Sequence, residues 1–209
     1  MVSSNKPTTV YWLGNSLYLN ITNQCSNNCW FCFRNYKQGV GDFNLKLAKE
    51  PTAAEIVSEL EQVLPSRRWG EVVFCGFGEP TTRLDLLLEI AQWIKTHYAT
   101  VSIRLDTNGH GFALNKGRDV AAKLKAAGIS KASVSLNGHD EETYCENCRP
   151  LFGGAFEAVL EFVQKAKLAG LEVEVSAVRL PEVDIQKVKL VADGLGAPFR
   201  VRDYIPCFW

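Results

Sequence analysis

Strand-like and helix-like segments alternate along almost the whole chain, and this alternation restricts the possible folds more than any other feature. A first strand is expected within a hairpin over residues 11–22, with Gly14 and Asn15 at its turn. Further apolar, strand-like runs follow at residues 71–75, 101–107, 131–136, 172–178 and 199–204. Helix-like runs with apolar residues at helical spacing separate them, at residues 53–64, 84–98, 118–127, 155–169 and 185–193. Such alternation predicts parallel strands joined by right-handed crossovers.

Two architectures have this pattern, an open doubly wound sheet and an incomplete barrel. Six strands do not close the usual eight-stranded α/β barrel, but they suit an open, three-quarter barrel. We therefore predict an α/β fold, a partial (βα)6 TIM-type barrel, as one domain over residues 1–209 with its core at about residues 16–204. In either architecture ligands bind at the carboxyl ends of the strands.

Composition excludes several classes of function. Lys and Arg together number 23, as do Asp and Glu, so bulk electrostatic binding to nucleic acid or anionic lipid is not expected. No apolar run approaches the ~18 residues of a membrane helix, and the polar N-terminal residues lack the apolar core of a secretion signal. We therefore expect a cytoplasmic protein with no membrane association. Seven cysteines are many for a reducing compartment, which favours metal, cluster or redox chemistry over disulfides.

Three of the cysteines follow the first predicted strand in a short loop. Cys25, Cys29 and Cys32 have the spacing C-x3-C-x2-C. Thiolates select soft metals such as zinc, copper(I) and iron–sulfur clusters. A structural zinc site normally has four protein ligands, whereas three cysteines on a [4Fe–4S] cluster leave one iron open to a further ligand. A zinc site and three incidental thiols remain the alternatives.

The loop Cys25-Ser-Asn-Asn-Cys29-Trp-Phe-Cys32 resembles the cysteine motif of the radical S-adenosylmethionine (SAM) superfamily, with Phe31 at its aromatic position. The resemblance covers about residues 16–204 and implies a partial barrel with two cofactors. The three cysteines would hold a [4Fe–4S] cluster, and the methionine amino and carboxylate groups of SAM would bind its fourth iron. Reduction then cleaves SAM to a 5′-deoxyadenosyl radical that abstracts a hydrogen atom. A reducing partner such as flavodoxin or ferredoxin is implied as well.

Polar and glycine residues end the other predicted strands. Glycines let a backbone approach a ligand closely, and a carboxylate beside them can accept from an ammonium group. Ser133, Ser135 and Asn137 alternate along one strand and so share a face. Alternative readings are plain turns for residues 76–80 and 106–109 and a surface charge for Arg179. The resemblance assigns SAM binding to Phe31, Gly76, Gly78, Glu79, Pro80, Asp106, Thr107, Asn108, Ser135, Asn137 and Arg179.

Several residues are not explained by the resemblance. Cys75 is expected to be a small buried apolar residue. The pair Cys145 and Cys148 could bind a second metal together with Cys207, could be redox-active, or could be two unrelated thiols. Basic side chains that could bind an anionic substrate, or only pair with surface charges, are Arg34, Lys37, Arg149, Arg200 and Arg202. The histidines show no ligand spacing, although His110 and His139 follow strand ends. The apolar tail over residues 205–209 could pack below the barrel or cover the site.

The overall sequence of the chain is similar to those of the short radical SAM proteins called TatD-associated. That similarity implies a radical SAM enzyme whose small-molecule or macromolecular substrate is undefined, with a possible association with a TatD-type nuclease. Two other enzymes fit a small barrel: a 7-carboxy-7-deazaguanine-synthase-like enzyme, and a glycyl-radical-activating enzyme. An iron–sulfur electron carrier or a zinc-binding module would need neither the Gly76–Pro80 segment nor the Ser133–Asn137 segment.

Overall fold

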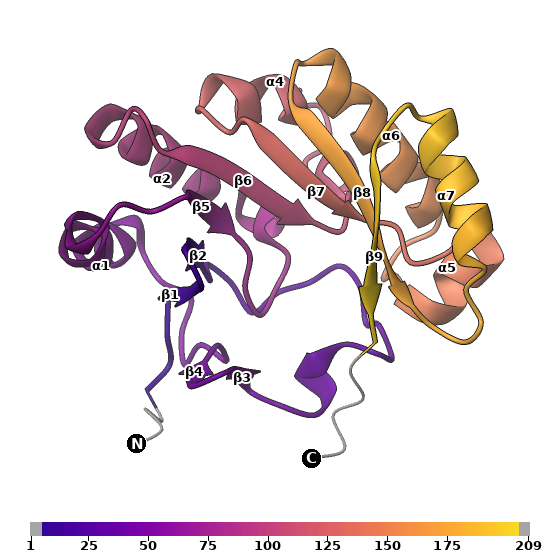
Figure 1. Cartoon of the computed structure of the whole chain (residues 1–209), viewed down its shortest axis with the longest axis horizontal. Coiled ribbons are helices and arrows are strands. Elements are labelled where there is room, and N and C mark those ends of the chain that lie inside the picture. Colours follow the sequence, from indigo (N-terminus) through magenta and orange to yellow (C-terminus); the bar gives the residue numbers. More distant parts are fainter. Residues whose placement is uncertain (1–5, 205–209) are drawn as a thin grey trace.

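The main sheet is open and almost entirely parallel. The computed structural model describes residues 6–204, and its seven-stranded sheet has the order β1-β2-β5-β6-β7-β8-β9 (Figure 1). The strands are β1 (Val10–Leu13), β2 (Ser16–Leu19), β5 (Glu71–Phe74), β6 (Ser102–Thr107), β7 (Lys131–Ser135), β8 (Glu172–Arg179) and β9 (Phe199–Asp203). Only β1 is antiparallel to its neighbour. The sheet curves without closing, so the predicted partial barrel is confirmed.

Five helices cover the convex face of the sheet (Figure 1). They are α1 (Ala53–Val63), α2 (Leu84–His97), α4 (Val120–Ala126), α6 (Ala155–Leu168) and α7 (Ile185–Gly194). Each lies in a predicted helical range, except that α7 ends one residue later than predicted. The Thr52 hydroxyl accepts from the Glu55 backbone N–H, and the Glu55 carboxylate accepts from the Thr52 backbone N–H, so α1 begins with a capping box.

The smaller elements were not expected from periodicity. They are the 3-10 turns η1 (Phe33–Asn35), η2 (Leu64–Ser66) and η3 (Pro80–Arg83), the pair β3 (Gly39–Val40) and β4 (Phe43–Asn44), and the helices α3 (Gly111–Leu114) and α5 (Glu141–Cys148). Helix α5 matters most, because it lies beside the cysteine loop. Its sequence is polar, yet Asp140 caps its first turn and Tyr144 and Cys148 are fully buried.

The two faces of the sheet differ in chemistry, and this difference creates the site. Side chains on the helix-covered face, such as Phe74, Leu105 and Val134, are fully buried in one apolar core. The alternate positions on the same strands carry charged and polar groups that face the concave side, among them Arg104 and Ser133. A closed TIM barrel fills its interior with branched apolar side chains. Here the polar interior predicts a ligand site.

Two further expectations concern the ends of the chain and the membrane. Over residues 6–204, no helix is both long and apolar enough to cross a membrane. Cys207 and the apolar tail over residues 205–209 lie outside the described residues.

Candidate active site

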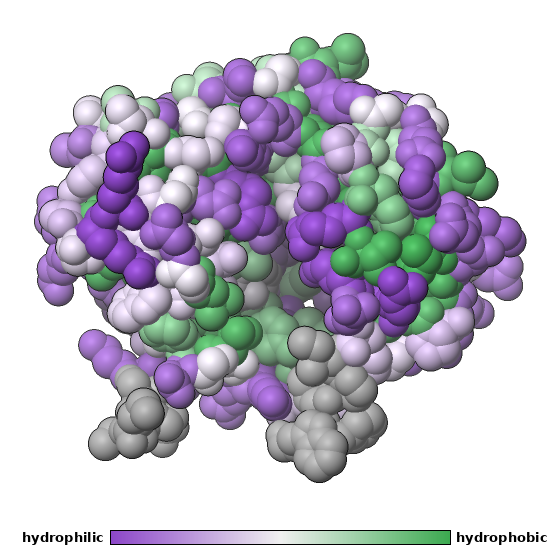
Figure 2. Space-filling view, viewed as in Figure 1, coloured by the Kyte–Doolittle hydropathy of each residue, from purple (hydrophilic) through white to green (hydrophobic). Residues whose placement is uncertain are grey.

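A cavity of about 960 Å³ occupies the concave side of the sheet. Figure 2 shows the molecule hollowed near the middle of this face, with hydrophilic residues beside the opening. Residues from all six parallel strands or the loops that follow them line it. The cavity brings together these predicted site residues: Cys25, Cys29, Phe31, Cys32, Gly76, Gly78, Glu79, Asp106, Thr107, Asn108, Ser135 and Asn137. Residues far apart in the sequence, such as those of the cysteine loop and β9, therefore face one space.

Two predicted residues, Pro80 and Arg179, do not line the cavity. Pro80 is buried at the start of η3. Arg179 follows Val178, which lines the cavity, and successive strand residues point to opposite faces. Arg179 is exposed, and its Nε lies 3.4 Å from Asp203 Oδ1. Arg179 therefore lies at the surface, as the alternative reading of a surface charge predicts.

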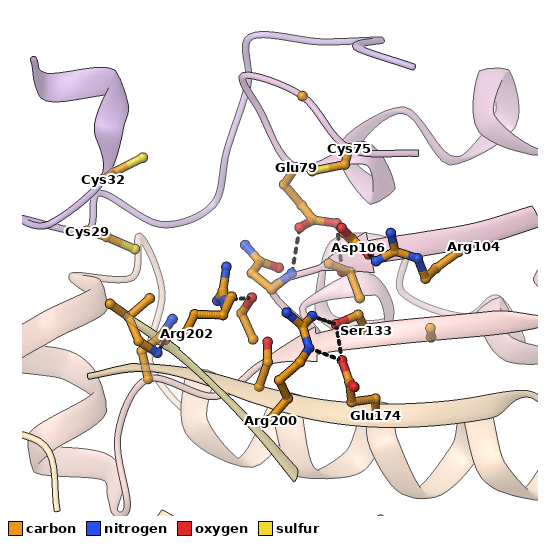
Figure 3. A pocket seen from close by; sticks show the side chains of 18 of the residues that line it. Cys29, Cys32, Cys75, Glu79, Arg104, Asp106, Ser133, Glu174, Arg200 and Arg202 are labelled. Carbon is orange, nitrogen blue, oxygen red and sulfur yellow. Dashed lines mark hydrogen bonds and ion pairs between the residues drawn. The ribbon is translucent and has the colours of Figure 1, made fainter. Parts of the chain in front are cut away.

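The cysteine loop offers three thiols to this cavity. None of the three forms a disulfide, and Figure 3 shows Cys29 and Cys32 projecting toward the cavity. Over the described residues, no three His, Cys, Asp or Glu side chains converge on one ion position. Each cysteine of a [4Fe–4S] cluster binds a different iron, so a cluster does not require three ligands at one ion position.

The protein environment alone does not favour thiolates. Burial and the nearby charge of Glu79 raise the pKa of Cys25 to about 12. A hydrogen bond with Cys148, together with burial, raises the pKa of Cys29. Burial also raises the pKa of Cys32. Cationic iron reverses this preference, because a coordinating thiol is deprotonated outright. The residues present fit a metal cluster as the group that makes these thiols anionic.

Helix α5 holds the cysteine loop through main-chain hydrogen bonds. The Asn28 N–H donates to the Cys148 carbonyl at 3.0 Å. The Trp30 N–H donates to the Asn147 carbonyl at 3.2 Å, and the Trp30 indole N–H donates to Asn147 Oδ1 at 2.8 Å. The loop thus takes its shape from a helix that apolar periodicity does not predict.

A chain of buried polar side chains supports the same loop. Asn108 Nδ2 donates to Ser26 Oγ at 2.9 Å, and Ser26 Oγ lies 2.8 Å from His110 Nδ1. His110 Nε2 lies 2.9 Å from the Tyr144 hydroxyl, which accepts from Asn27 Nδ2 at 3.1 Å. Burial lowers the pKa of His110 to about 4, so its imidazole is neutral at pH 7. His110 does not line the cavity and acts here as part of the scaffold.

Glu79 is a buried carboxylate with several protein donors. Its Oε1 accepts from the Thr81 N–H at 3.0 Å, the Thr81 hydroxyl at 2.7 Å and the Thr107 hydroxyl at 2.8 Å. Its Oε2 accepts from the Asn108 N–H at 2.7 Å. Burial raises the pKa of Glu79, and these hydrogen bonds oppose the rise. Glu79 therefore joins the loop after β5 to the end of β6. Its contact with the ammonium group of SAM stays a prediction.

The glycines after β5 allow a close approach of protein backbone. A Cβ atom at Gly76 would lie 2.2 Å from Asn20 Oδ1, and one at Gly78 would lie 2.2 Å from the Gln24 carbonyl oxygen. Both distances are too short for any side chain. The sequence predicts that a ligand lies close to these glycines, whereas in the structure the segment that enters the cysteine loop lies there.

Charged pairs line the deeper wall of the cavity (Figure 3). Arg104 lies 3.0 Å from Glu71 Oε1 and 2.5 Å from Asp106 Oδ1. Arg200 Nε donates to Glu174 Oε1 at 2.8 Å. Burial raises the pKa of Asp106, and the charge of Arg104 opposes that rise. Asp106 is thus paired with Arg104, and any contact with SAM would be in addition to this pair.

Within residues 6–204, no three His, Cys, Asp or Glu side chains that include Cys75, Cys145 or Cys148 converge on one ion position. Cys148 is fully buried in the apolar core, whereas Cys145 is partly exposed on α5. Cys75 was expected as an apolar core residue. It lies just past the end of β5 and lines the cavity instead, where burial raises its pKa.

The fold and the loop together define a class of protein: a partial α/β barrel that presents three cysteine thiols to a cavity at the carboxyl ends of its parallel strands. The Radical SAM superfamily matches residues 19–193. The chain belongs to this superfamily. Its members use a [4Fe–4S] cluster and SAM, so the predicted enzyme class and both cofactors are confirmed at the level of the superfamily.

Curated relatives and solved structures agree with this assignment. The chain is 35% identical over 161 residues to a probable GTP 3′,8-cyclase of Methanococcus aeolicus, covering 75% of this chain and 47% of the relative. It is 28% identical over 196 residues to a probable GTP 3′,8-cyclase of Pyrobaculum aerophilum, covering 90% and 57%. The chain therefore spans about half the length of these curated relatives.

The fold is shared with radical SAM structures of low sequence identity. Native anSMEcpe with bound AdoMet has a TM-score of 0.66 at 18% identity, covering 90% of this chain and 50% of that one. Methylornithine synthase has a TM-score of 0.65 at 19% identity, covering 91% and 53%. At these identities the likeness concerns the fold alone.

Proposed function

We propose that this chain is itself a radical SAM enzyme that cleaves SAM reductively and abstracts a hydrogen atom from a substrate held in the concave cavity. The observation that carries the proposal is that Cys25, Cys29 and Cys32 line the same cavity as the polar groups at the strand ends. In this superfamily a reduced [4Fe–4S] cluster supplies the electron that splits bound SAM into methionine and a 5′-deoxyadenosyl radical.

The protein contributes position and exclusion of water rather than the chemistry itself. Hydrogen bonds from the cysteine loop to α5 and to the His110–Tyr144 pair fix where the thiols lie. The curved sheet encloses the space below them. We propose that Phe31 and Asn137 contact SAM there, since both line the cavity. Contact between Ser135 and SAM stays a prediction. Asn137 Oδ1 also accepts from the Val178 N–H at 2.9 Å, which fixes its side chain.

Radical SAM enzymes generally need a reductant, and we propose a flavodoxin or ferredoxin for this one. The substrate is a separate question. The curated relatives are named for GTP, which makes a purine nucleotide the first compound to test. Because the chain spans about half of those relatives, their reaction is not carried over to it. A TatD-type nuclease as partner stays a prediction, as does a single domain over residues 1–209.

The test is release of 5′-deoxyadenosine under anaerobic conditions. The protein is reconstituted with iron and sulfide and then given SAM and dithionite. We expect release above a control without protein. Cys29→Ala should lose the cluster absorbance and abolish release, because a cluster ligand is removed. Cys145→Ala is the matched control: its thiol lies on α5 and does not line the cavity. That variant should keep wild-type release.

Two results would contradict the proposal. Undiminished release from Cys29→Ala would show that the cluster is held elsewhere. A wild-type protein with an intact cluster that released no 5′-deoxyadenosine, with SAM alone or with GTP added, would instead indicate an iron–sulfur electron carrier.

A further inference from the structure

Arg202 on β9 is a partly buried cation, and within residues 6–204 it has no carboxylate partner. Its side chain enters the cavity from the last strand of the sheet, below Cys29 and Cys32 in the view of Figure 3. Its Nη2 donates to Ser135 Oγ at 3.1 Å. Its Nε is buried and has no hydrogen-bond partner among the described residues. An unpaired buried charge is costly, so the position calls for a ligand.

The neighbouring arginines are different. Arg104 pairs with both Glu71 and Asp106, and Arg200 pairs with Glu174. No Asp or Glu of residues 6–204 lies within ion-pair distance of Arg202. Burial lowers the pKa of Arg202, and the charge of Arg200 adds to this effect. The nearby charge of Asp106 opposes it, but that carboxylate already contacts Arg104.

One hydroxyl group contacts the Arg202 side chain, and a second lines the same cavity. Ser135 Oγ accepts from Arg202, so the Ser135 proton is left to donate to another acceptor. Ser176 is the partner of Ser135 in the β7–β8 register and lines the same cavity. One guanidinium and two hydroxyls thus offer donors from different directions. A tetrahedral group with several acceptor oxygens satisfies such a set better than a planar carboxylate.

We infer that Arg202, with Ser135 and Ser176, forms a subsite for a phosphate group of the substrate. The inference rests on the proposed function, because it places the phosphate-bearing substrate in the cavity that holds SAM. The carboxylate of SAM is not the expected ligand, since the superfamily resemblance commits that carboxylate to the fourth iron. Glu174 and Asp106, the acidic side chains that face this region, are already paired with Arg200 and Arg104.

The experiment uses inorganic phosphate as the probe. Calorimetric titration is made on the reconstituted protein saturated with SAM, at constant ionic strength because screening changes weak charge contacts. We expect the wild-type protein to bind phosphate and Arg202→Gln to bind it at least about tenfold more weakly, since a hydrogen bond to a charged group is lost. Arg202→Lys keeps the positive charge but lacks the paired N–H donors of the guanidinium, so its phosphate affinity should lie between those of the other two proteins. Arg118→Gln is the matched control, as Arg118 pairs with Asp85 away from the cavity.

The possible results separate the subsite from the proposed function. Equal phosphate binding by the wild-type protein and Arg202→Gln overturns the subsite, and so does an absence of binding to the wild-type protein. Displacement of SAM by phosphate assigns Arg202 to SAM and overturns the substrate subsite. Acetate that binds as tightly as phosphate overturns the choice of phosphate. If phosphate binds as expected but the same samples release no 5′-deoxyadenosine, only the proposed function fails. Circular dichroism confirms that each variant is folded, and Arg202→Lys replaces Arg202→Gln if the latter is not.

Discussion

Glu79, which is buried, and Arg202, which is partly buried, are both charged side chains at the cavity, but their hydrogen bonds differ. Glu79, after β5, receives four hydrogen bonds from three residues of the chain. Arg202, on β9, makes one hydrogen bond to Ser135 and leaves a buried donor unpaired. A buried charge whose donors or acceptors are satisfied by the chain belongs to the architecture. One that is left unsatisfied indicates where a ligand completes the structure.

The same contrast separates the two sides of the barrel. Around the cysteine loop, Ser26, Asn27, His110 and Tyr144 form a continuous buried network that needs no ligand for most of its hydrogen bonds. On the other side, Arg202 of β9 directs its positive charge into the cavity. Stability and ligand binding should therefore respond to mutations on different sides of the cavity.

Glu79→Gln should produce the largest change in stability. The amide keeps the size of the carboxylate, but its NH2 group would face the Asn108 N–H, so two donors meet without an acceptor. We expect the free energy of unfolding to fall by about 3 kcal/mol, measured by urea denaturation under anaerobic, reducing conditions. Thr107→Val removes only one donor to Glu79 and should cost about 1 kcal/mol. A cost for Glu79→Gln no larger than for Thr107→Val would show that the Glu79 carboxyl is protonated.

Lowering the pH should reduce the free energy of unfolding by up to about 3 kcal/mol through protonation of His110. In the folded protein the pKa of His110 is about 4, whereas an unfolded chain protonates histidine near pH 6.5. Unfolding therefore takes up a proton between these values, and stability falls as the pH falls from 6.5 toward 4. Urea denaturation at pH 7 and pH 5 measures the effect. His110→Gln should show a smaller difference between the two pH values, and an unchanged difference would refute the assignment.

Arg202→Met should have the smallest effect on stability and the opposite sign. Replacing an unpaired, partly buried cation with an apolar side chain removes a desolvation cost and strands no carboxylate partner. We expect the free energy of unfolding to rise by about 1 kcal/mol in the same urea experiment, while phosphate binding is lost. A decrease of about 2 kcal/mol or more would place Arg202 among the residues that hold the fold, beside Glu79.

The barrel was predictable because its signals are local. Alternating apolar periods located the strands and the five outer helices, and α6 begins at Ala155 as expected. The rule that ligands bind at strand ends then brought most of the predicted site residues to one cavity. Arg179 departs from the prediction for a simple reason: it is one residue past Val178, and that step turns a side chain to the other face.

The support of the cysteine loop was not predictable from local patterns. Helix α5 has little apolar periodicity, and its contacts with the loop join residues far apart in the chain. The bond between Asn27 and Tyr144 spans 117 positions. The glycines after β5 illustrate the same limit, because the atoms that exclude a side chain there belong to Asn20 and Gln24. The spacing of the cysteines identifies the three thiols, but tertiary packing determines where they lie.

The distance in sequence between the cysteine loop and α5 has a consequence for biosynthesis. During translation, Cys25, Cys29 and Cys32 leave the ribosome long before the residues that shape their loop, which extend to Leu151 through its hydrogen bond with the Ser26 carbonyl. Until then the loop lacks these contacts, and its thiols are open to solvent and to oxidants. A nascent chain that stops short of Leu151 has the three cysteine ligands but lacks the residues that hold their loop in place. Insertion of a cluster into the folded loop must therefore follow synthesis of about three quarters of the chain.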